Sequence, residues 1–307
     1  MKKVIIAFLL LYGCNTPTFK EDTHLVKANP PERRITYAAK LPPAPFLAIY
    51  QKKGKTLILV AADHGPKSLL SVHYAFGEYH SQIALIEREP GFPLGNCMQH
   101  EDAYTAALSA KNNIPLVRTD ADYKRQWEYA KRHGFSYEDF QMQWIIKNAD
   151  GVARYDHKQP SATEEIENYK RDVHNPDWGE LFTEDRLLAY FQKNYDRNFN
   201  TTDFIQFRRD LQGNSPEKWV RKTPFYKMMH NQPDVRSVFM LQNITAALNE
   251  YEVVFSEMGS GHFVDIYDAL NKMLGNPRFV RADQIPPQEL WKECSLKGLQ
   301  EKVLIKD

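Results

Sequence analysis

Two histidines each follow a short run of apolar residues, and this repeated arrangement is the clearest chemical feature of the sequence. Residues 56–64 read TLILVAADH, and residues 252–262 read EVVFSEMGSGH. Both runs are rich in β-branched and aliphatic residues and are too short for an average helix, which predicts buried strands. Because an imidazole can act as a general base or bind a metal, His64 and His262 are candidate functional residues. A turn histidine bonded only to the backbone is the alternative for His64.

Two charged side chains join the histidines as candidates. Residues 82–87 (QIALIE) predict another short strand, so that Glu87 ends a strand of the same sheet. Arg236 lies on the predicted helix before the second histidine, off its main apolar stripe. An acid exposed to water and a solvated arginine are the ordinary alternatives at these positions.

The elements that must position these residues alternate between strand and helix. Residues 46–51 and 56–61 predict a β-hairpin, and a helical pattern follows each histidine. The prediction is an α/β fold with a mostly parallel sheet, built from two pseudo-symmetric strand-helix units. The carboxyl ends of parallel strands form the crevice where ligands bind, so both histidines are expected to face one pocket.

The middle and the end of the chain have other patterns. Residues 121–232 carry aromatic and charged residues at helical spacing, which predicts a helical insertion in a domain that covers residues 46–307. A separate helical domain is the alternative. Residues 233–251 predict the most regular helix, which leads into a strand at 252–256 and then a turn at His262. Residues 281–307 show no chemistry that we can name.

The N-terminus has the features of a lipoprotein signal. Two lysines precede the apolar stretch VIIAFLLL, which is followed by Leu-Tyr-Gly-Cys. This resembles a bacterial lipobox, so residues 1–13 are expected to be cleaved and Cys14 lipidated; an ordinary secretory signal is the alternative. Residues 14–45, polar and rich in proline, predict a flexible tether. Cys97 and Cys294 are consistent with one disulfide or with two free thiols.

Composition excludes several function classes. The chain has 307 residues, with 40 basic against 39 acidic side chains, so no strong positive field attracts nucleic acid. The motifs of serine hydrolases, zincins and common nucleotide-binding proteins are absent. We therefore expect a small-molecule or peptide substrate, no nucleic-acid partner, and a membrane contact made through the lipid anchor.

The four candidate residues and their order resemble a known superfamily. It joins TraB, GumN and TIKI proteins with the erythromycin esterase and ChaN-like proteins, and its members carry two G-x-x-H motifs, an acid after the second strand and an arginine on the helix before the second motif. Residues 259–262 (GSGH) match the second motif fully. Residues 61–64 (AADH) match the first in part, because alanine replaces glycine. Glu87 and Arg236 are similar to the family acid and arginine.

The resemblance implies a hydrolase of peptide or ester bonds in the bacterial cell envelope, on the periplasmic or extracellular side. TIKI-like members are described as metal-dependent peptidases, which would make His64, Glu87 and His262 ligands of a divalent metal. In the esterase-like branch a histidine deprotonates water without metal, with Arg236 stabilising the oxyanion. ChaN-like relatives are associated with haem, so a haem-binding or metal-binding lipoprotein without turnover is the alternative. A degenerate scaffold without catalytic activity is a third reading.

Overall fold

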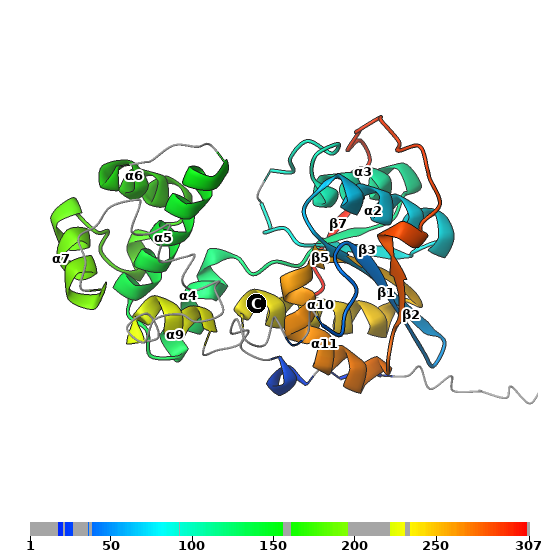
Figure 1. The fold of residues 1–307 in the computed structure, drawn as a ribbon, viewed down its shortest axis with the longest axis horizontal. Helices are drawn as coiled ribbons and strands as arrows, with labels where there is room; N and C mark the ends of the chain where they lie inside the picture. The colour runs from blue at the N-terminus through cyan, green and yellow to red at the C-terminus, as the bar shows by residue number, and fades with distance from the viewer. Residues whose placement is uncertain are drawn as a thin grey trace, which may run out of the picture.

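A seven-stranded sheet organises the chain (Figure 1). The computed structural model describes residues 18–20, 22–26, 36, 39–91, 93–155, 161–195, 222–230 and 234–305. Across the sheet the order is β6 (Arg278–Arg281), β1 (Phe46–Lys52), β2 (Lys55–Ala62), β5 (Val253–Gly259), β3 (Ile83–Ile86), β4 (Leu116–Arg118) and β7 (Glu301–Lys302). The predicted α/β class with a mostly parallel sheet is confirmed.

One edge of the sheet is antiparallel. Strands β1 and β2 form the predicted hairpin, and β1 also pairs antiparallel with β6. The two-residue turn of the hairpin has positive φ at both Lys53 (51°) and Gly54 (77°). This is the geometry of a type I′ turn, whose twist matches that of the flanking strands.

The parallel strands bring the two histidine segments together. Strand β2 pairs in parallel with β5, with Ala62 opposite Gly259. Strand β3 lies on the other side of β5, also parallel to it. Strand β5 continues to Gly259, three residues beyond the predicted end at Ser256. The segments that carry His64, Glu87 and His262 therefore leave the sheet together, at the carboxyl ends of these parallel strands.

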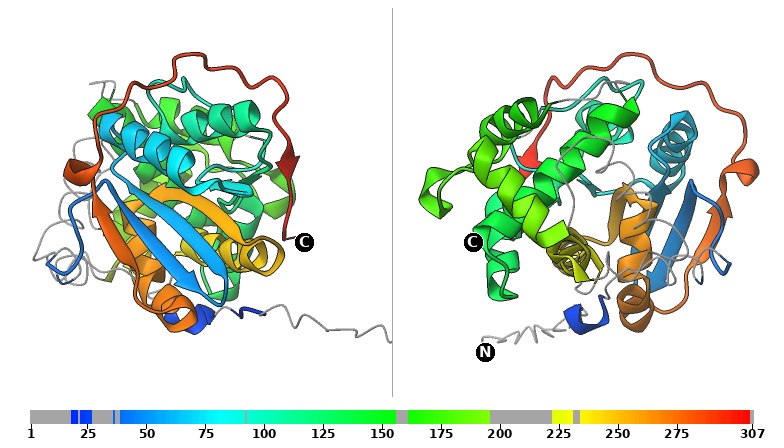
Figure 2. Two further views of the ribbon diagram at one scale, coloured as in Figure 1. Left: turned by 90° about the vertical axis from the view of Figure 1, so that its right-hand side faces the viewer. Right: turned by 60° about the vertical axis from the view of Figure 1, so that its left-hand side comes forward.

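Helices cover both faces of the sheet (Figure 2). Along β2 the side chains alternate: Ile58 and Val60 pack with α2 and α3, while Leu57 and Leu59 pack with α10 and α11. This period of two is expected for a strand buried on both faces. The four helices are α2 (Pro66–Tyr79), α3 (Glu101–Asn112), α10 (Val235–Glu250) and α11 (Ser260–Leu274).

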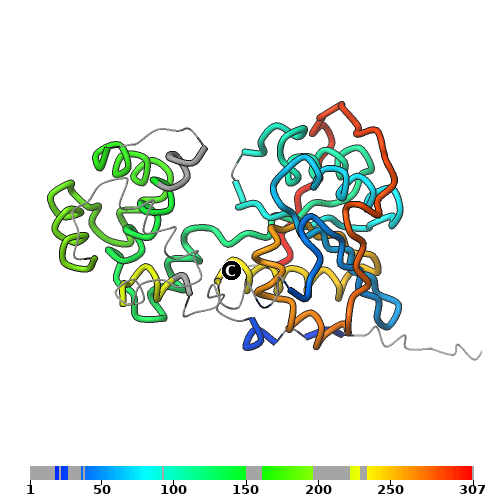
Figure 3. The backbone as a smooth tube through the Cα atoms, in the orientation of Figure 1, coloured from blue at the N-terminus to red at the C-terminus, as the bar shows by residue number. Residues whose placement is uncertain are grey.

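A group of helices lies beside the sheet (Figure 3). These helices have their own apolar cluster. Its centre is aromatic, with Trp127, Phe140, Tyr169 and Phe191 buried together. The elements are α4 (Tyr123–Arg132), α5 (Tyr137–Tyr155), α6 (Ala162–Asp172), the 3-10 helix η2 (Pro176–Trp178), α7 (Glu184–Tyr195) and α9 (Pro224–His230). They occupy the described part of the predicted helical insertion. Residues 196–221 and 231–233 lie outside the described residues.

The N-terminal segment differs from the predicted free tether. Phe19 and Val26 are buried in the cluster beneath α10 and α11, on either side of the 3-10 helix η1 (Thr23–Leu25). The Phe19 backbone also exchanges hydrogen bonds with the side-chain amide of Asn249. Burying two large apolar side chains explains why this segment is held. The predicted signal peptide and Cys14 lie outside the described residues, and in the described part no helix combines the length and apolarity needed to cross a bilayer.

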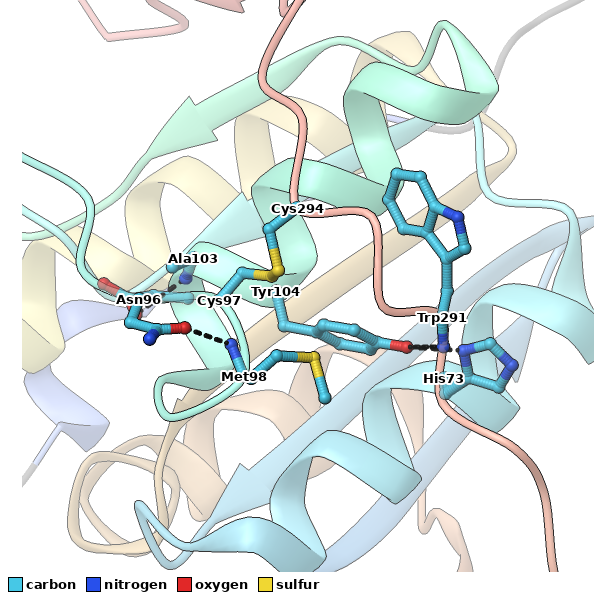
Figure 4. The surroundings of a disulfide bond; sticks show 9 residues. His73, Asn96, Cys97, Met98, Ala103, Tyr104, Trp291 and Cys294 are labelled. Carbon is cyan, nitrogen blue, oxygen red and sulfur yellow. Dashed lines mark hydrogen bonds between the residues drawn. A yellow bond between two sulfur atoms is a disulfide. The ribbon is translucent and has the colours of Figure 1, made fainter.

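The C-terminal segment was predicted to carry no chemistry, yet it is joined covalently to the site region. Cys97 and Cys294 form a disulfide across 197 residues of sequence (Figure 4). Nearby, the Tyr104 hydroxyl accepts a hydrogen bond from the backbone N–H of Trp291. After the 3-10 helix η4 (Ala282–Gln284), this segment crosses over α3 and ends as strand β7 beside β4.

Candidate functional site

The two histidines reach the carboxyl edge of the sheet in different ways. His64 follows β2 in a short loop and has a positive φ of 57°. His262 lies in the first turn of α11, which begins at Ser260 directly after β5, so the predicted turn at this position is wrong. Strand β5 extends to Gly259 and α11 begins at the next residue, so no turn separates the two elements. His64 is therefore presented by a loop, and His262 by a helix.

His64 is paired with an acid that the sequence did not single out. Its Nδ1 atom contacts Oε1 of Glu101, which lies in the first turn of α3 and is buried. The hydrogen bond to Glu101 outweighs partial burial and raises the pKa of His64 above its usual value. The His64 side chain is 62% exposed, so its Nε2 edge remains open to ligands. An acid that is hydrogen-bonded to one nitrogen of an imidazole fixes the orientation of the ring, and so the direction in which the other nitrogen points.

Glu87 and Arg236 belong to one buried ion network. The guanidinium of Arg236 donates to Oε1 of Glu87 over 2.8 Å and to both oxygens of Asp120, over 2.7 and 2.6 Å. Burial opposes the charge of Arg236, but Asp120 and Glu87 raise its pKa well above the usual value. Oε2 of Glu87 also accepts a hydrogen bond from the backbone N–H of Gly259. Arg236 is therefore a structural counter-ion at the site rather than a solvated side chain.

His262 is held as a cation by its neighbours. Its Nε2 atom lies 3.2 Å from Oε1 of Glu87, and its Nδ1 atom lies 2.8 Å from Oγ of Ser237. Since the Ser237 hydroxyl donates to Asp265 over 2.7 Å, it accepts from Nδ1–H of His262. Burial disfavours the imidazolium, but Glu87 outweighs burial and raises the pKa of His262 to about 9. In turn, His262 and Arg236 outweigh burial and lower the pKa of Glu87 well below its usual range.

Gly259 is the point of closest approach between the two histidine segments. A Cβ atom at this position would come within 2.8 Å of Nε2 of His64 and 3.2 Å of Oε2 of Glu87. Carbon atoms do not approach polar atoms so closely without displacement, so any larger residue would push these groups apart. The glycine therefore leaves the space between His64 and Glu87 open.

A further acid, Glu257, lies beneath the site in β5. The residue is 1% exposed, and its Oε2 atom has no hydrogen-bond partner among the described residues. Burial, and then the nearby carboxylate of Glu101, raise the pKa of Glu257 well above its usual value. A buried carboxyl oxygen without a partner is costly and is therefore expected to serve a ligand or a reaction.

Two hollows meet at His64, Glu87 and Arg236. The larger, of about 560 Å³, lies between the start of α11 and the helical region, where Phe140 and Met228 supply apolar surface. The smaller, of about 260 Å³, extends toward α3 and is lined mainly by charged side chains. Together they form a divided cleft whose centre holds three of the four predicted site residues.

The described residues contain a group of possible metal ligands that differs from the predicted set. Among the described residues, the three ligating side chains whose donor atoms lie within 4.8 Å of one another are Asp234, His262 and Asp265. The predicted ligands His64 and Glu87 do not belong to this group. Oγ of Ser237 lies between His262 and Asp265. It accepts a hydrogen bond from Nδ1–H of His262, so this nitrogen has no lone pair to offer a metal. An imidazole must be deprotonated to bind a metal. The donor set therefore fits a hydrogen-bonded imidazolium.

Sequence reasoning missed several members of the site. Asp120 directly follows β4, so its position at a strand end of the same sheet is a usable signal. Glu257 interrupts the apolar run of β5, and a lone acid inside a buried strand is a signal of the same kind. Glu101 and Ser237 have no such signal, because each approaches its histidine only through packing of helices that are remote in the sequence.

Comparison with known proteins adds no relative. No family model, no curated protein and no solved structure matches the chain. The functional argument therefore depends on the fold and on the geometry of the cleft.

Proposed function

We propose that the protein hydrolyses an ester or peptide bond, with His64 as the general base and without a catalytic metal. One observation carries this proposal: Glu101 holds Nδ1 of His64, while Nε2 faces the cleft beside Gly259 and Glu87. A histidine oriented by a carboxylate is the usual means of activating a hydroxyl group or water at neutral pH. The resemblance to the esterase-like branch of the superfamily supports the same chemistry.

In the proposed reaction, Nε2 of His64 takes a proton from water as the water oxygen bonds to the substrate carbonyl carbon. The carbonyl π electrons move to oxygen and give a tetrahedral oxyanion. When the oxyanion collapses, the bond to the leaving oxygen or nitrogen breaks, and the His64 imidazolium donates its proton to that atom. The products are an acid and an alcohol or amine, and the histidine returns to its neutral form.

Positive potential for the oxyanion is available at the start of α11, beside His64. The N-cap of α11 is Gly259, and no side chain in the described part of the protein caps this helix end. The first backbone N–H groups of a helix have no partner within the helix and favour negative charge. Ser260 and Gly261 line the larger hollow at this end. Arg236 and His262 also line this hollow, where both are paired with Glu87.

The same proposal places the protein on a membrane through Cys14, in the bacterial cell envelope, as a member of the superfamily that joins TraB, GumN and TIKI proteins with the esterase and ChaN-like proteins. The lipobox-like sequence and the order of His64, Glu87, Arg236 and His262 support it. The helical region lines the cleft with residues of α4, α5 and α9, so it would shape the choice of substrate.

The central test compares two histidine variants. We expect His64→Asn to lower the rate of p-nitrophenyl butyrate and peptide hydrolysis by about 100-fold or more, the range for loss of a general base. Asparagine tolerates the positive φ at this position. His80→Asn is the matched control, because His80 also has a positive φ, of 41°, but is exposed and lines neither hollow. Activity should persist in a chelator.

Other outcomes would identify the alternatives. Full activity in His64→Asn would refute the proposal, and activity lost to a chelator and restored by a divalent metal would refute the metal-free chemistry. A Soret band on haem titration, reduced in the histidine variants and unaccompanied by hydrolysis, would favour the haem-binding lipoprotein.

A further inference from the structure

The smaller hollow is lined by more acidic than basic side chains. Six carboxyl groups line it, against three lysine or arginine side chains and two histidines, and the pKa values of two of the six, Glu257 and Glu89, are raised by burial. The acids are Glu87, Glu89, Glu101, Asp102, Asp120 and Glu257. Such crowding in a space of about 260 Å³ disfavours an anionic ligand and favours a small cation.

The positive side chains of the lining do not cancel this excess. Arg236 is already bound by Glu87 and Asp120. The guanidinium of Arg88 lies 3.4 Å from Asp102 and also donates to the carbonyl of Pro93. The ammonium group of Lys147 lies 4.3 Å from the centre of the Trp144 ring, at the opening shared with the larger hollow.

One buried carboxyl oxygen in this lining has no hydrogen-bond donor. Oε2 of Glu257 has no hydrogen-bond partner among the described residues, and the residue is 1% exposed. Leaving such a group unsatisfied costs free energy that a ligand donating hydrogen bonds would recover. This observation is independent of the charge count and indicates the same kind of ligand.

We propose that the smaller hollow binds a primary ammonium group of the substrate through Glu257 and its neighbouring carboxylates, beside the carbonyl that His64 attacks. This inference rests on the proposed function and names its substrate class, an ester or amide that carries a cationic amine. An ammonium group offers three N–H donors in a small volume, which suits several carboxylates that approach from different sides.

Two further observations agree with an organic cation. A metal ion needs ligands within about 2.0–2.6 Å of one centre, and the closely spaced ligand group found among the described residues lies elsewhere, around His262. In addition, burial and then the carboxylate of Asp120 raise the pKa of Glu89 to about 7. An ammonium group would relieve this crowding of like charges.

The ammonium group can come from either of two sources, the amino terminus of a peptide or the amine of an amino sugar. Isothermal titration of the full chain in detergent with L-alaninamide and with D-glucosamine distinguishes them. The N-acetylated form of each compound has the same skeleton without the cation and is the ligand control. The same titrations with His64→Asn measure binding in the absence of turnover.

We expect one amine to bind and its N-acetylated form to bind at least about 10-fold more weakly, as loss of a hydrogen bond to a charged group implies. Glu257→Gln keeps the volume of the side chain and should weaken amine binding by a similar factor. Glu89→Gln is a second variant at a less buried position, in case the first does not fold. Glu78→Gln, an exposed glutamate on α2, is the protein control and should bind as the parent does.

Failure of both amines to bind, or equal binding of the acetylated forms, would overturn the inference. So would amine binding unchanged in both Glu257→Gln and Glu89→Gln. If hydrolysis requires His64 but no amine binds, only this inference fails. If an amine binds as expected but no hydrolysis depends on His64, the proposed function fails and the amine site stands.

Discussion

At the scale of single residues, the two histidines have different protonation chemistry because their neighbours differ. His64 has one nitrogen held by Glu101 and the other open to the cleft. His262 has both nitrogens engaged, by Glu87 and by Ser237, and is buried. A group with a pKa of about 9 is a cation at neutral pH and cannot accept a proton. His64 is therefore the candidate base, and His262 a fixed positive charge.

The role of Glu101 is tested by the pH dependence of hydrolysis. The base form of His64 is required, so kcat/KM should rise with pH through a pKa that Glu101 holds above the usual 6.5. Glu101→Gln removes the carboxylate, so this acid limb should move to lower pH while the plateau rate falls by roughly 10-fold or more. Glu78→Gln should leave the profile in place. An acid limb that does not move in Glu101→Gln would show that this pair does not control the reaction.

At the scale of elements, the junctions between strands and helices build the site. Strand β5 passes into α11 without a loop, so the helix N-terminus and His262 lie at the strand end. Helix α3 begins with Glu101 and Asp102, and acids are favoured in the first turn of a helix. This helix start brings Glu101 to His64. The contacts of His64 with Glu101 and of Glu87 with Arg236 thus each join the end of a strand to the beginning of a helix.

The close approach of the two histidine segments at Gly259 predicts that a larger side chain at this position lowers the rate of hydrolysis. In Gly259→Ala the new methyl group would lie 2.8 Å from Nε2 of His64. Because φ is −57°, the backbone accepts alanine, and we expect hydrolysis to fall by about 10-fold or more while the fold is retained. Gly77→Ala is the matched control, since nothing lies within 4 Å of its added Cβ and alanine stabilises a helix interior by roughly 0.5–1 kcal/mol. Activity measurements and thermal unfolding of both variants decide the matter, and an unaffected rate in Gly259→Ala would contradict the crowding argument.

At the scale of the whole molecule, the disulfide ties the C-terminal segment to the loop that precedes α3. Cys97 lies four residues before Glu101, and Cys294 lies in the segment that leads to β7. The disulfide closes a very long loop, so it removes much conformational freedom from the unfolded chain. It also holds together two parts of the chain that approach the sheet from opposite ends of the sequence.

Replacement of both cysteines by serine should therefore lower the free energy of unfolding by about 2–5 kcal/mol. Urea unfolding of Cys97→Ser/Cys294→Ser, compared with the parent in oxidising and reducing buffer, measures this loss. The parent should approach the variant when reduced. An unchanged midpoint in both comparisons would indicate that the cross-link does not contribute to stability.

The sequence by itself determined the strands that carry the two histidine segments and their alternation with helices, and it predicted four site residues whose function stays a prediction. These are local properties: the apolar runs at residues 56–62 and 252–256 have the length of buried strands, and small residues follow them. The α/β class with a mostly parallel sheet followed from that alternation. Glu87 was accessible because it ends a predicted strand, whereas Arg236 was singled out through the resemblance to the superfamily.

Tertiary structure alone decided which of these residues act on one another. The pairing of β2 with β5 places Ala62 beside Gly259, and only then do the two histidine segments share a cleft. Glu101, Asp120 and Ser237 enter through helix packing and strand order, which depend on contacts between residues far apart in the chain. The protonation of each histidine depends on these partners, so the choice between a metal ligand, a base and a fixed cation was not available from local sequence.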